Sequence, residues 1–167
     1  MSGKITLIGD TWTSTRPVTV STRPVARQDA DGLARLFFTA YDDGSVTSQA
    51  HALEILHHMF DGEYGAVLPK ASPVVVDDAG RIIAAALVLE SRVGDDLPDS
   101  PYIFELFTES SRRREGFAEQ LLRVAITELK EEGFEHVALR ISEDNAAALA
   151  LYLTLDFRRW FPEEDEL

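Results

Sequence analysis

The chain contains no cysteine, which excludes disulfide bonds, thiolate metal sites and a cysteine nucleophile. Cations are also in short supply, and the formal net charge is −13 over 167 residues. A general affinity for nucleic acid depends on clustered lysine and arginine that bind phosphates. We therefore expect no nucleic acid among the partners of this protein.

Long apolar runs are missing as well. No run reaches the roughly 18 residues that a membrane-spanning helix needs, and the apolar stretch after residues 1–4 is too short for a signal peptide. We therefore expect a cytoplasmic protein with no membrane partner. A domain of this length buries roughly 70% of its unfolded surface, so it can hold a core without covalent staples. We predict a single domain over residues 18–167, preceded by an N-terminal extension over residues 1–17 that could supply an edge strand.

Hydrophobic periodicity and turn residues divide the chain into strands and helices. The first two strand-like stretches could pair as a hairpin. Asp29 is the expected cap of the first helix, and Thr47 or Ser48 that of the second. The expected strands cover residues 4–8, 18–22, 73–77, 82–89, 102–108, 136–142 and 157–161, and the expected helices cover residues 29–41, 47–60, 117–130 and 145–155.

This order of elements predicts an α/β (α+β) fold with a mixed central sheet. Hairpins give antiparallel pairs of strands, whereas the strand-helix-strand unit at residues 102–142 requires a parallel pair. The helices must then cover both faces of the sheet.

A short basic turn lies between the strand that ends near Thr108 and the following helix. Its sequence is Arg113-Arg114-Glu115-Gly116-Phe117-Ala118. A helix start offers unpaired N–H groups and the positive end of the helix dipole, which suits a pyrophosphate. Small residues at Gly116 and Ala118 would let phosphates approach the backbone. By itself this pattern arises often by chance, and the arginine run at residues 112–114 could equally be an exposed helix start.

A second motif follows the next strand. Asn145, Ala148, Leu151 and Tyr152 form the pattern Asn-x-x-Ala-x-x-Leu-Tyr, and Leu155-Asp156-Phe157 comes after it. Together the two motifs resemble those of the GNAT superfamily of acyl-CoA-dependent N-acetyltransferases. The resemblance is strongest over residues 102–160. It implies a GNAT-like, mostly antiparallel central sheet with a parallel β-α-β core that binds CoA.

The resemblance also implies acetyl-CoA as the acyl donor and no metal. Backbone amides at the helix start would hold the CoA pyrophosphate, and the preceding strand would pair with the pantetheine arm as an extra strand would. The residues that the resemblance assigns to the cofactor are Leu106, Thr108, Arg113, Arg114, Gly116, Phe117, Ala118, Glu119 and Asn145.

Direct attack of an amine on the thioester needs no protein nucleophile, but it needs a neutral amine and a proton for the departing thiolate. The resemblance makes Tyr152 our candidate for the proton donor, although without the surrounding motif it would be interpreted as a core aromatic. Glu105 is the best placed carboxylate for a general base, and an ordinary solvent-facing strand residue is an equal alternative. His57 and His58 are further candidates, for which surface or packing roles are the stronger interpretation.

Three features depart from the family pattern. Glu115 places a negative charge beside the expected pyrophosphate, and Asp156 replaces a glycine that usually takes a left-handed conformation. Members normally continue with two strands, whereas only residues 157–167 remain here. We therefore expect residues 4–8, or a neighbouring subunit, to fill the missing edge, so a homodimer is one expected assembly.

The leading interpretation is an N-acetyltransferase that moves an acetyl (acyl) group from acetyl-CoA to a primary amine. The alternative is a CoA-binding or sensing module without transferase activity, and a third interpretation is an acidic interaction protein that does not bind CoA. Acidic residues that would flank the acceptor weakly favour a cationic amine, although a solvated acidic surface explains them equally well. These residues are Asp42, Asp43, Asp61 and Glu63.

Overall fold

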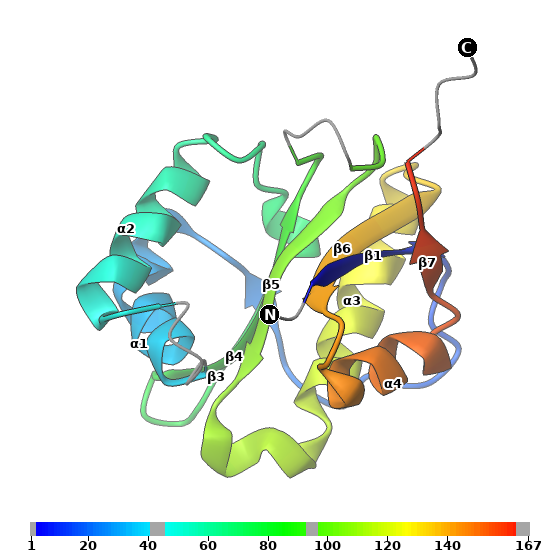
Figure 1. The fold of residues 1–167 in the computed structure, drawn as a ribbon. Coiled ribbons are helices and arrows are strands. Elements are labelled where there is room, and N and C mark those ends of the chain that lie inside the picture. The colour runs from blue at the N-terminus through cyan, green and yellow to red at the C-terminus, as the bar shows by residue number, and fades with distance from the viewer. Residues whose placement is uncertain (1–2, 41–45, 93–96, 163–167) are drawn as a thin grey trace.

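The computed structural model describes residues 3–40, 46–92 and 97–162 (Figure 1). The strands there are β1 (Lys4–Asp10), β2 (Arg23–Pro24), β3 (Pro73–Val76), β4 (Ile82–Leu89), β5 (Tyr102–Thr108), β6 (His136–Ser142) and β7 (Arg158–Trp160). The helices are α1 (Ala30–Ala40), α2 (Gln49–Phe60), α3 (Phe117–Glu131) and α4 (Ala146–Thr154). Short 3₁₀ turns are η1 (Arg27–Asp29), η2 (Pro69–Ala71) and η3 (Ser110–Glu115).

The described strands form one mixed sheet in the order β2-β3-β4-β5-β6-β1-β7. The pair β5–β6 is parallel, and the other neighbouring pairs are antiparallel. Helices α1 and α2 cover one face of the sheet, and α3 and α4 cover the other, as Figure 1 shows. The predicted fold class, with a mostly antiparallel sheet and helices on both faces, is confirmed.

Strand β4 is the centre of the core, because all eight of its residues are buried. Its side chains alternate between the faces: Leu87 and Leu89 join the cluster under α1 and α2, and Val88 joins the cluster under α3 and α4. A strand buried on both sides reads as a continuous apolar run, which is why residues 82–89 were recognisable in the sequence.

Local hydrogen bonds explain where the helices begin. The Ser48 hydroxyl accepts a hydrogen bond from the His51 N–H at 3.0 Å and caps α2, as expected. Asp29 lies in η1, just before α1, and its buried carboxylate accepts three bonds of 2.8 Å from the Arg23 guanidinium and the Ala26 N–H. These partners hold the pKa of Asp29 below its usual range. Asp29 therefore ties β2 to η1.

Strand β1 lies inside the sheet, between β6 and β7, and runs antiparallel to both. The hairpin expected between residues 4–8 and 18–22 is wrong, because β1 pairs elsewhere and residues 18–22 form no strand. The expectation of an edge strand is corrected too, since the edge here is β7. The N-terminal stretch does extend the sheet beyond β6, as expected. The division into an extension over residues 1–17 and a domain over residues 18–167 stays a prediction.

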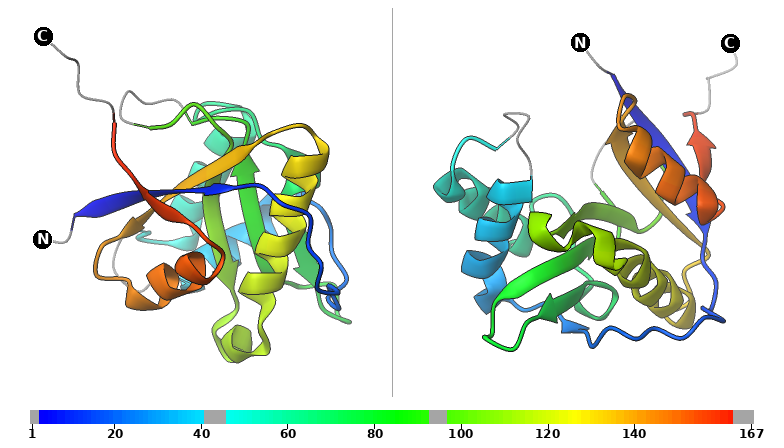
Figure 2. Two further views of the ribbon diagram at one scale, coloured as in Figure 1. Left: turned by 90° about the vertical axis from the view of Figure 1, so that its right-hand side faces the viewer. Right: turned by 90° about the horizontal axis from the view of Figure 1, so that it is seen from below.

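The segment after β1 runs past α3 on its way to β2, as Figure 2 shows. The Ser14 N–H donates to the Thr127 hydroxyl at 3.0 Å. The N–H groups of Thr19 and Val20 donate to the Gln120 side-chain oxygen at 2.9 and 3.1 Å. These bonds fasten the N-terminal segment along the length of α3.

A close contact holds β1 against the chain that follows α4. An added Cβ at Gly9 would lie 2.9 Å from the ring of Phe157, which is buried in the cluster under α3 and α4. The Asp10 carboxylate lies 3.3 Å from the His136 ring and 3.5 Å from the Arg158 guanidinium. Glycine at position 9 is thus required by space, not by backbone conformation.

Gly9→Ala should lower the free energy of unfolding by about 1–3 kcal/mol, because the new methyl group overpacks the Phe157 ring. Gly3→Ala is the matched control, since its nearest atoms belong to the Glu143 side chain at 3.7 Å, an ordinary contact. Urea denaturation of the three proteins measures the difference. Equal midpoints for the two variants would contradict the packing described here.

Candidate functional site

Strands β5 and β6 are parallel neighbours that separate along their length. In the described residues they pair where Tyr102 faces Ala138, and the Ala138 N–H donates to the Pro101 carbonyl at 2.8 Å. Beyond this point each strand continues without pairing to the other, towards η3 and α4 at the lower edge of Figure 1. The facing edges therefore carry backbone donors and acceptors for another partner.

A bulge bends β5 close to the point of separation. Leu87 of β4 pairs with Glu105 and Val88 pairs with Ile103, so Phe104 is an extra residue in β5. Such a bulge kinks the strand and re-aims its side chains. The bulge thus places Phe104 and Glu105 beside the gap.

The gap between β5 and β6 forms a cavity of about 120 Å³ that α4 closes on one side. Its walls are Ile103, Phe104, Glu105 and Leu106 of β5, Leu139, Arg140 and Ile141 of β6, and Asn145, Ala148, Leu151 and Tyr152 of α4 and its cap. The two residues predicted to act in catalysis, Tyr152 and Glu105, therefore line the same cavity.

Tyr152 is buried in the cluster under α3 and α4, with its ring edge-on to Phe157 at 5.2 Å between centroids. Burial, and then the negative charge of Glu105, raise the pKa of the Tyr152 phenol well above its ordinary value. The phenol therefore stays protonated at neutral pH. In the described part of the chain, every fully buried side-chain oxygen has a hydrogen-bond partner. The Tyr152 hydroxyl has no such partner there, so it is not fully buried and must be accessible from the cavity that Tyr152 lines.

Gly116 begins α3 from a left-handed conformation with φ of 77°, which favours glycine. No atom lies within 4 Å of the place that a Cβ would take, so the space before the helix is open. The Gly116 carbonyl accepts from the Gln120 N–H at 3.3 Å. The N–H groups of Phe117, Ala118 and Glu119 precede this first helical bond and need another partner, so the helix start fits a phosphate group.

The basic turn before this helix is η3. Arg113 and Arg114 belong to it, and their side chains lie outside the described part of the structure. The Glu115 carboxylate lies 3.9 Å from the Arg112 guanidinium, so its charge is balanced in part by a neighbour. The Glu119 carboxylate accepts a hydrogen bond from the Arg123 guanidinium at 2.6 Å, further along the helix. The backbone N–H of Glu119 belongs to the first turn of α3 and takes no part in this bond.

The remaining residues assigned to the cofactor lie on elements that border the gap. Leu106 lies on β5 and lines the cavity, and Thr108 is buried and pairs with Ala84 of β4. Asn145 caps α4, because its side-chain oxygen accepts from the Ala148 N–H at 3.1 Å. Asn145 therefore starts the helix that carries Tyr152, and its contact with a cofactor stays a prediction.

Asp156 takes the left-handed conformation expected for the glycine that it replaces, with φ of 66°. In the same turn the Phe157 N–H donates to the Tyr152 carbonyl at 3.0 Å. Aspartate tolerates this conformation better than most residues. The substitution therefore leaves the turn after α4 intact.

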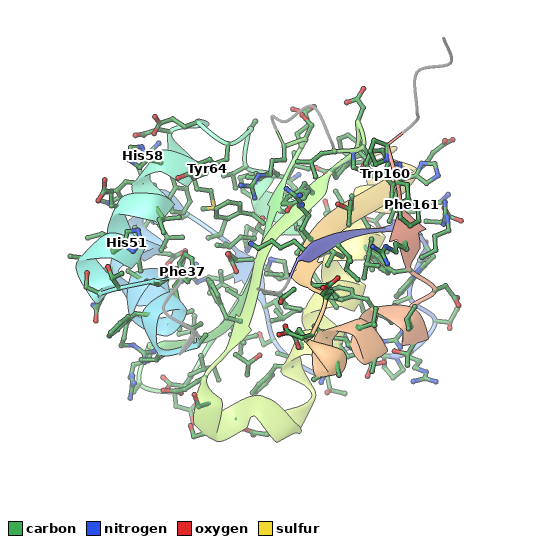
Figure 3. All side chains as sticks on the ribbon, in the orientation of Figure 1. Phe37, His51, His58, Tyr64, Trp160 and Phe161 are labelled. Carbon is green, nitrogen blue, oxygen red and sulfur yellow. The ribbon has the colours of Figure 1, made fainter. Side chains whose placement is uncertain are left out.

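The histidine and acidic candidates on the α2 side do not reach the cavity between β5 and β6. His58 lies on α2 (Figure 3), where its ring bonds to Glu63, and this bond raises the pKa of His58. His57 is exposed, and the Asp61 carboxylate is held by Arg27 at 2.8 Å. Asp61 and Glu63, two of the four acids that were expected to favour a cationic acceptor, thus already have partners. The other two, Asp42 and Asp43, lie outside the described residues.

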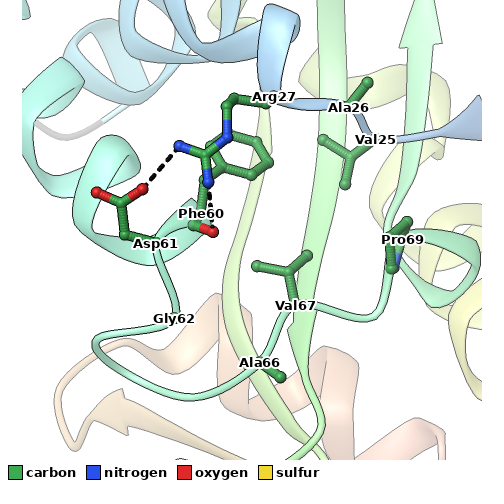
Figure 4. Close-up of a pocket in the computed structure, with 9 residues that line it drawn as sticks. All are labelled: Val25, Ala26, Arg27, Phe60, Asp61, Gly62, Ala66, Val67 and Pro69. Atoms are coloured by element: carbon green, nitrogen blue, oxygen red, sulfur yellow. Dashed lines mark hydrogen bonds and ion pairs between the residues drawn. The ribbon is translucent and has the colours of Figure 1, made fainter.

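A second, larger pocket of about 380 Å³ lies at the end of α2 (Figure 4). Arg27 donates there to the Asp61 carboxylate and the Phe60 carbonyl, both at 2.8 Å, and the opposite wall contains Val25 and Val67. Asp61, predicted to flank the acceptor, lines this pocket and is paired with Arg27, whereas none of the predicted catalytic or cofactor residues lies there.

Two arginines near the cavity were not among the predicted site residues. Arg140 is part of the cavity wall, and Arg92 lies over the ring of Phe104, another wall residue. No short motif marks either position. The alternation along residues 136–142 could have placed Arg140 on the opposite face from Leu139, but not beside Tyr152.

The described segments were expected to hold neither a metal site nor a membrane-spanning helix. No group of three or more histidine or acidic residues is arranged there to hold a metal ion. No helix in those segments is both long and apolar enough to cross a membrane.

The family model described as the acetyltransferase (GNAT) family matches residues 30–157. This chain therefore belongs to the GNAT family of acetyltransferases. No curated protein matches the sequence.

Solved structures show the same fold. A GCN5-related N-acetyltransferase from Sphaerobacter thermophilus has a TM-score of 0.69 and 16% identity over 95% of this chain and 48% of its own, so this chain spans about half of it. An aminoglycoside 6′-N-acetyltransferase from Acinetobacter haemolyticus has a TM-score of 0.62 and 18% identity over 89% of this chain and 97% of its own. The ribosomal-protein-S18-alanine N-acetyltransferase from Escherichia coli has a TM-score of 0.61 and 20% identity over 81% of this chain and 75% of its own.

An alkaline titration that follows the ultraviolet absorbance of tyrosinate tests the environment of Tyr152. Its phenol should ionise above the ordinary pH of about 10, because burial and the charge of Glu105 disfavour the anion. Subtracting the Tyr152→Phe curve from that of the wild type isolates this phenol. Glu105→Gln should lower its midpoint, and an isolated transition at or below the ordinary value would refute the buried environment.

Proposed function

We propose that this protein is an N-acetyltransferase that moves an acetyl group from acetyl-CoA to a primary amine by direct attack. The observation that carries the proposal is the cavity between the separated strands β5 and β6, which Tyr152 and Glu105 both line. A cytoplasmic location and a homodimer remain predictions from the sequence.

The elements around the gap are suited to a long, phosphate-bearing donor. The open edge of β5 offers backbone groups to the amide-containing pantetheine arm, in the way that an extended peptide adds to a sheet. The N–H groups of Phe117, Ala118 and Glu119 offer a positive helix end to the pyrophosphate. When bound, acetyl-CoA supplies an activated acyl group at the cavity.

Glu105 and Tyr152 divide the proton transfers between them. Glu105 takes a proton from the ammonium form of the acceptor, which frees the nitrogen lone pair for attack on the thioester carbon. The new C–N bond forms as the C–S bond breaks, and a β5 N–H stabilises the negative charge on the carbonyl oxygen. Tyr152 donates its hydroxyl proton to the departing sulfur, and the second proton that the nitrogen loses as the amide forms restores the phenol, so that the proton held by Glu105 is the one released in each turnover.

The pKa of Tyr152 suits the role of a donor. A thiol has an ordinary pKa near 8.5, so a phenol with a raised pKa holds its proton until the thiolate develops. It hydrogen-bonds to the developing thiolate and passes its proton to the sulfur while it regains one from the nitrogen of the new amide. The same property makes Tyr152 unsuitable as the base, which favours Glu105 for that role.

A CoA-binding module without transferase activity is the competing function. Its support came from Glu115, Asp156 and the few residues after α4. Arg112 lies beside Glu115, the turn at Asp156 keeps its left-handed form, and β1 and β7 extend the sheet beyond β6. All three features are therefore compatible with an active enzyme.

Gly116→Trp should weaken the binding of acetyl-CoA by about 10-fold or more, because an indole would occupy the open space before α3. Isothermal titration calorimetry of the purified protein measures the affinity. Gly133→Trp is the matched control: Gly133 also has a positive φ and open surroundings, but it follows the other end of α3. Equal affinities in the two variants would remove the helix start from the binding site.

Tyr152→Phe should lower kcat by roughly 100-fold or more, while acetyl-CoA binds as before, since the variant loses only the proton donor. Glu105→Gln should lower kcat at neutral pH and have less effect at alkaline pH, where more of the amine is already neutral. Release of free CoA with a panel of amines measures both. An unchanged kcat in Tyr152→Phe would exclude the proposed role of the phenol.

A further inference from the structure

Arg140 is a cation on the wall of the cavity that Tyr152 and Glu105 share. Its neighbours Leu139 and Ile141 pack into the cluster under α3 and α4, so Arg140 points to the opposite face of β6, like Ala138. No carboxylate of the described residues pairs with its guanidinium. Arg140 therefore offers all its donors to a molecule on the α1 and α2 side of the sheet.

Arg92 is held in a fixed position beside the same cavity. Its guanidinium lies 5.2 Å from the ring centre of Tyr102, 5.4 Å from that of Phe104 and 5.8 Å from that of Tyr64. The rings of Tyr64 and Phe104 stack on each other at 5.2 Å, and Tyr64 is labelled in Figure 3. Cation–π contacts hold the plane of the guanidinium, and a hydrogen bond to the Tyr102 side chain uses part of its edge, so the remaining N–H groups can donate to a ligand.

Both arginines act on Tyr102. Burial raises the pKa of the Tyr102 hydroxyl, whereas the charge of Arg92, its hydrogen bond and the charge of Arg140 lower it, and the charge of Glu105 raises it. The cavity wall thus contains the Glu105 carboxylate and the Arg140 guanidinium, and Arg92 lies over the wall residue Phe104.

This arrangement is unusual within a chain of net charge −13. Several other described arginines have acidic partners: Arg23 pairs with Asp29, and both Arg35 and Arg81 lie close to Glu109. Within the described segments, Arg92, Arg140 and Arg159 have no ion pair with an acidic residue, and of these three Arg159 lies away from the cavity, over Phe161. Guanidinium groups bind carboxylates through paired, charge-assisted hydrogen bonds, so two such groups at one cavity suit an anionic ligand.

From this juxtaposition we infer that the acceptor is a small amine that carries a carboxylate near its amino group, as a free amino acid does. The inference rests on the proposed transferase function. Arg140 binds the carboxylate, Arg92 supports it from the aromatic cluster, and Glu105 receives the ammonium end. A polyamine or another purely cationic acceptor would instead meet the charge of Arg140.

The binding test does not require turnover. A set of N-acetylated amino acids and their carboxamides is titrated calorimetrically into the protein in the presence of CoA. The wild type should bind the carboxylate member of a pair about 10-fold more tightly, a difference of about 1.4 kcal/mol. This preference should disappear in Arg140→Gln and weaken in Arg92→Gln.

Two controls separate a specific contact from a change of net charge. Arg159→Gln removes the same charge from β7, where Arg159 lies over Phe161 and away from the cavity, and it should keep the preference. Arg140→Lys keeps the charge without the planar fork and should retain part of the preference. Equal binding of the two members of every pair by the wild type, absence of binding by either, or an undiminished preference in Arg140→Gln would overturn the inference.

Turnover separates this inference from the proposed function. Faster CoA release with amino acids than with their carboxamides supports both. CoA release that is equal for the two, or faster with polyamines, keeps the transferase and overturns the carboxylate specificity. Selective binding of carboxylates without CoA release from any amine overturns the transferase and supports the carboxylate site.

Discussion

The separation of β5 from β6 is the constraint on which the whole site depends. The two parallel strands pair where Tyr102 faces Ala138 and then separate. They therefore expose backbone N–H and C=O groups that would be paired with each other in a continuous sheet. The same parting makes room for side chains from both strands and from α4 to meet. The donor edge and the cavity lined by Tyr152 and Glu105 therefore have one structural cause.

A strand open on one edge needs firm support on the other, and β1 gives that support to β6. Pairing runs along the full length of both strands, from Lys4 opposite Ser142 to Asp10 opposite His136. Thr6 lies directly opposite Arg140, so the N-terminal segment supports the wall of the cavity from far away in the sequence. Bonds from residues 14, 19 and 20 to α3 then hold this segment in place.

Local signals predicted the elements well, because they depend on neighbours in the sequence. Ser48 and Asn145 cap their helices, and Gly116 and Asp156 take left-handed conformations, since side-chain capping and backbone sterics act over a few residues. The predicted hairpin of residues 4–8 was wrong because strand pairing depends on residues far apart in the sequence. Two adjacent strand-like stretches in a sequence favour a hairpin. In the fold, β1 instead pairs with the available edges of β6 and β7, which come from the other end of the chain.

The sequence by itself determined the order of elements, the mixed sheet and the motif residues around Gly116 and Tyr152, because periodicity and turn chemistry are written in consecutive residues. The tertiary structure alone decided that β1 is internal, that Asp61 and Glu63 have close partners, that Arg140 and Glu105 line one cavity, and that Arg92 lies over the wall residue Phe104. These facts depend on contacts between residues far apart in the chain. Charge balance at a site is a property of such contacts, so the composition of the chain does not reveal it.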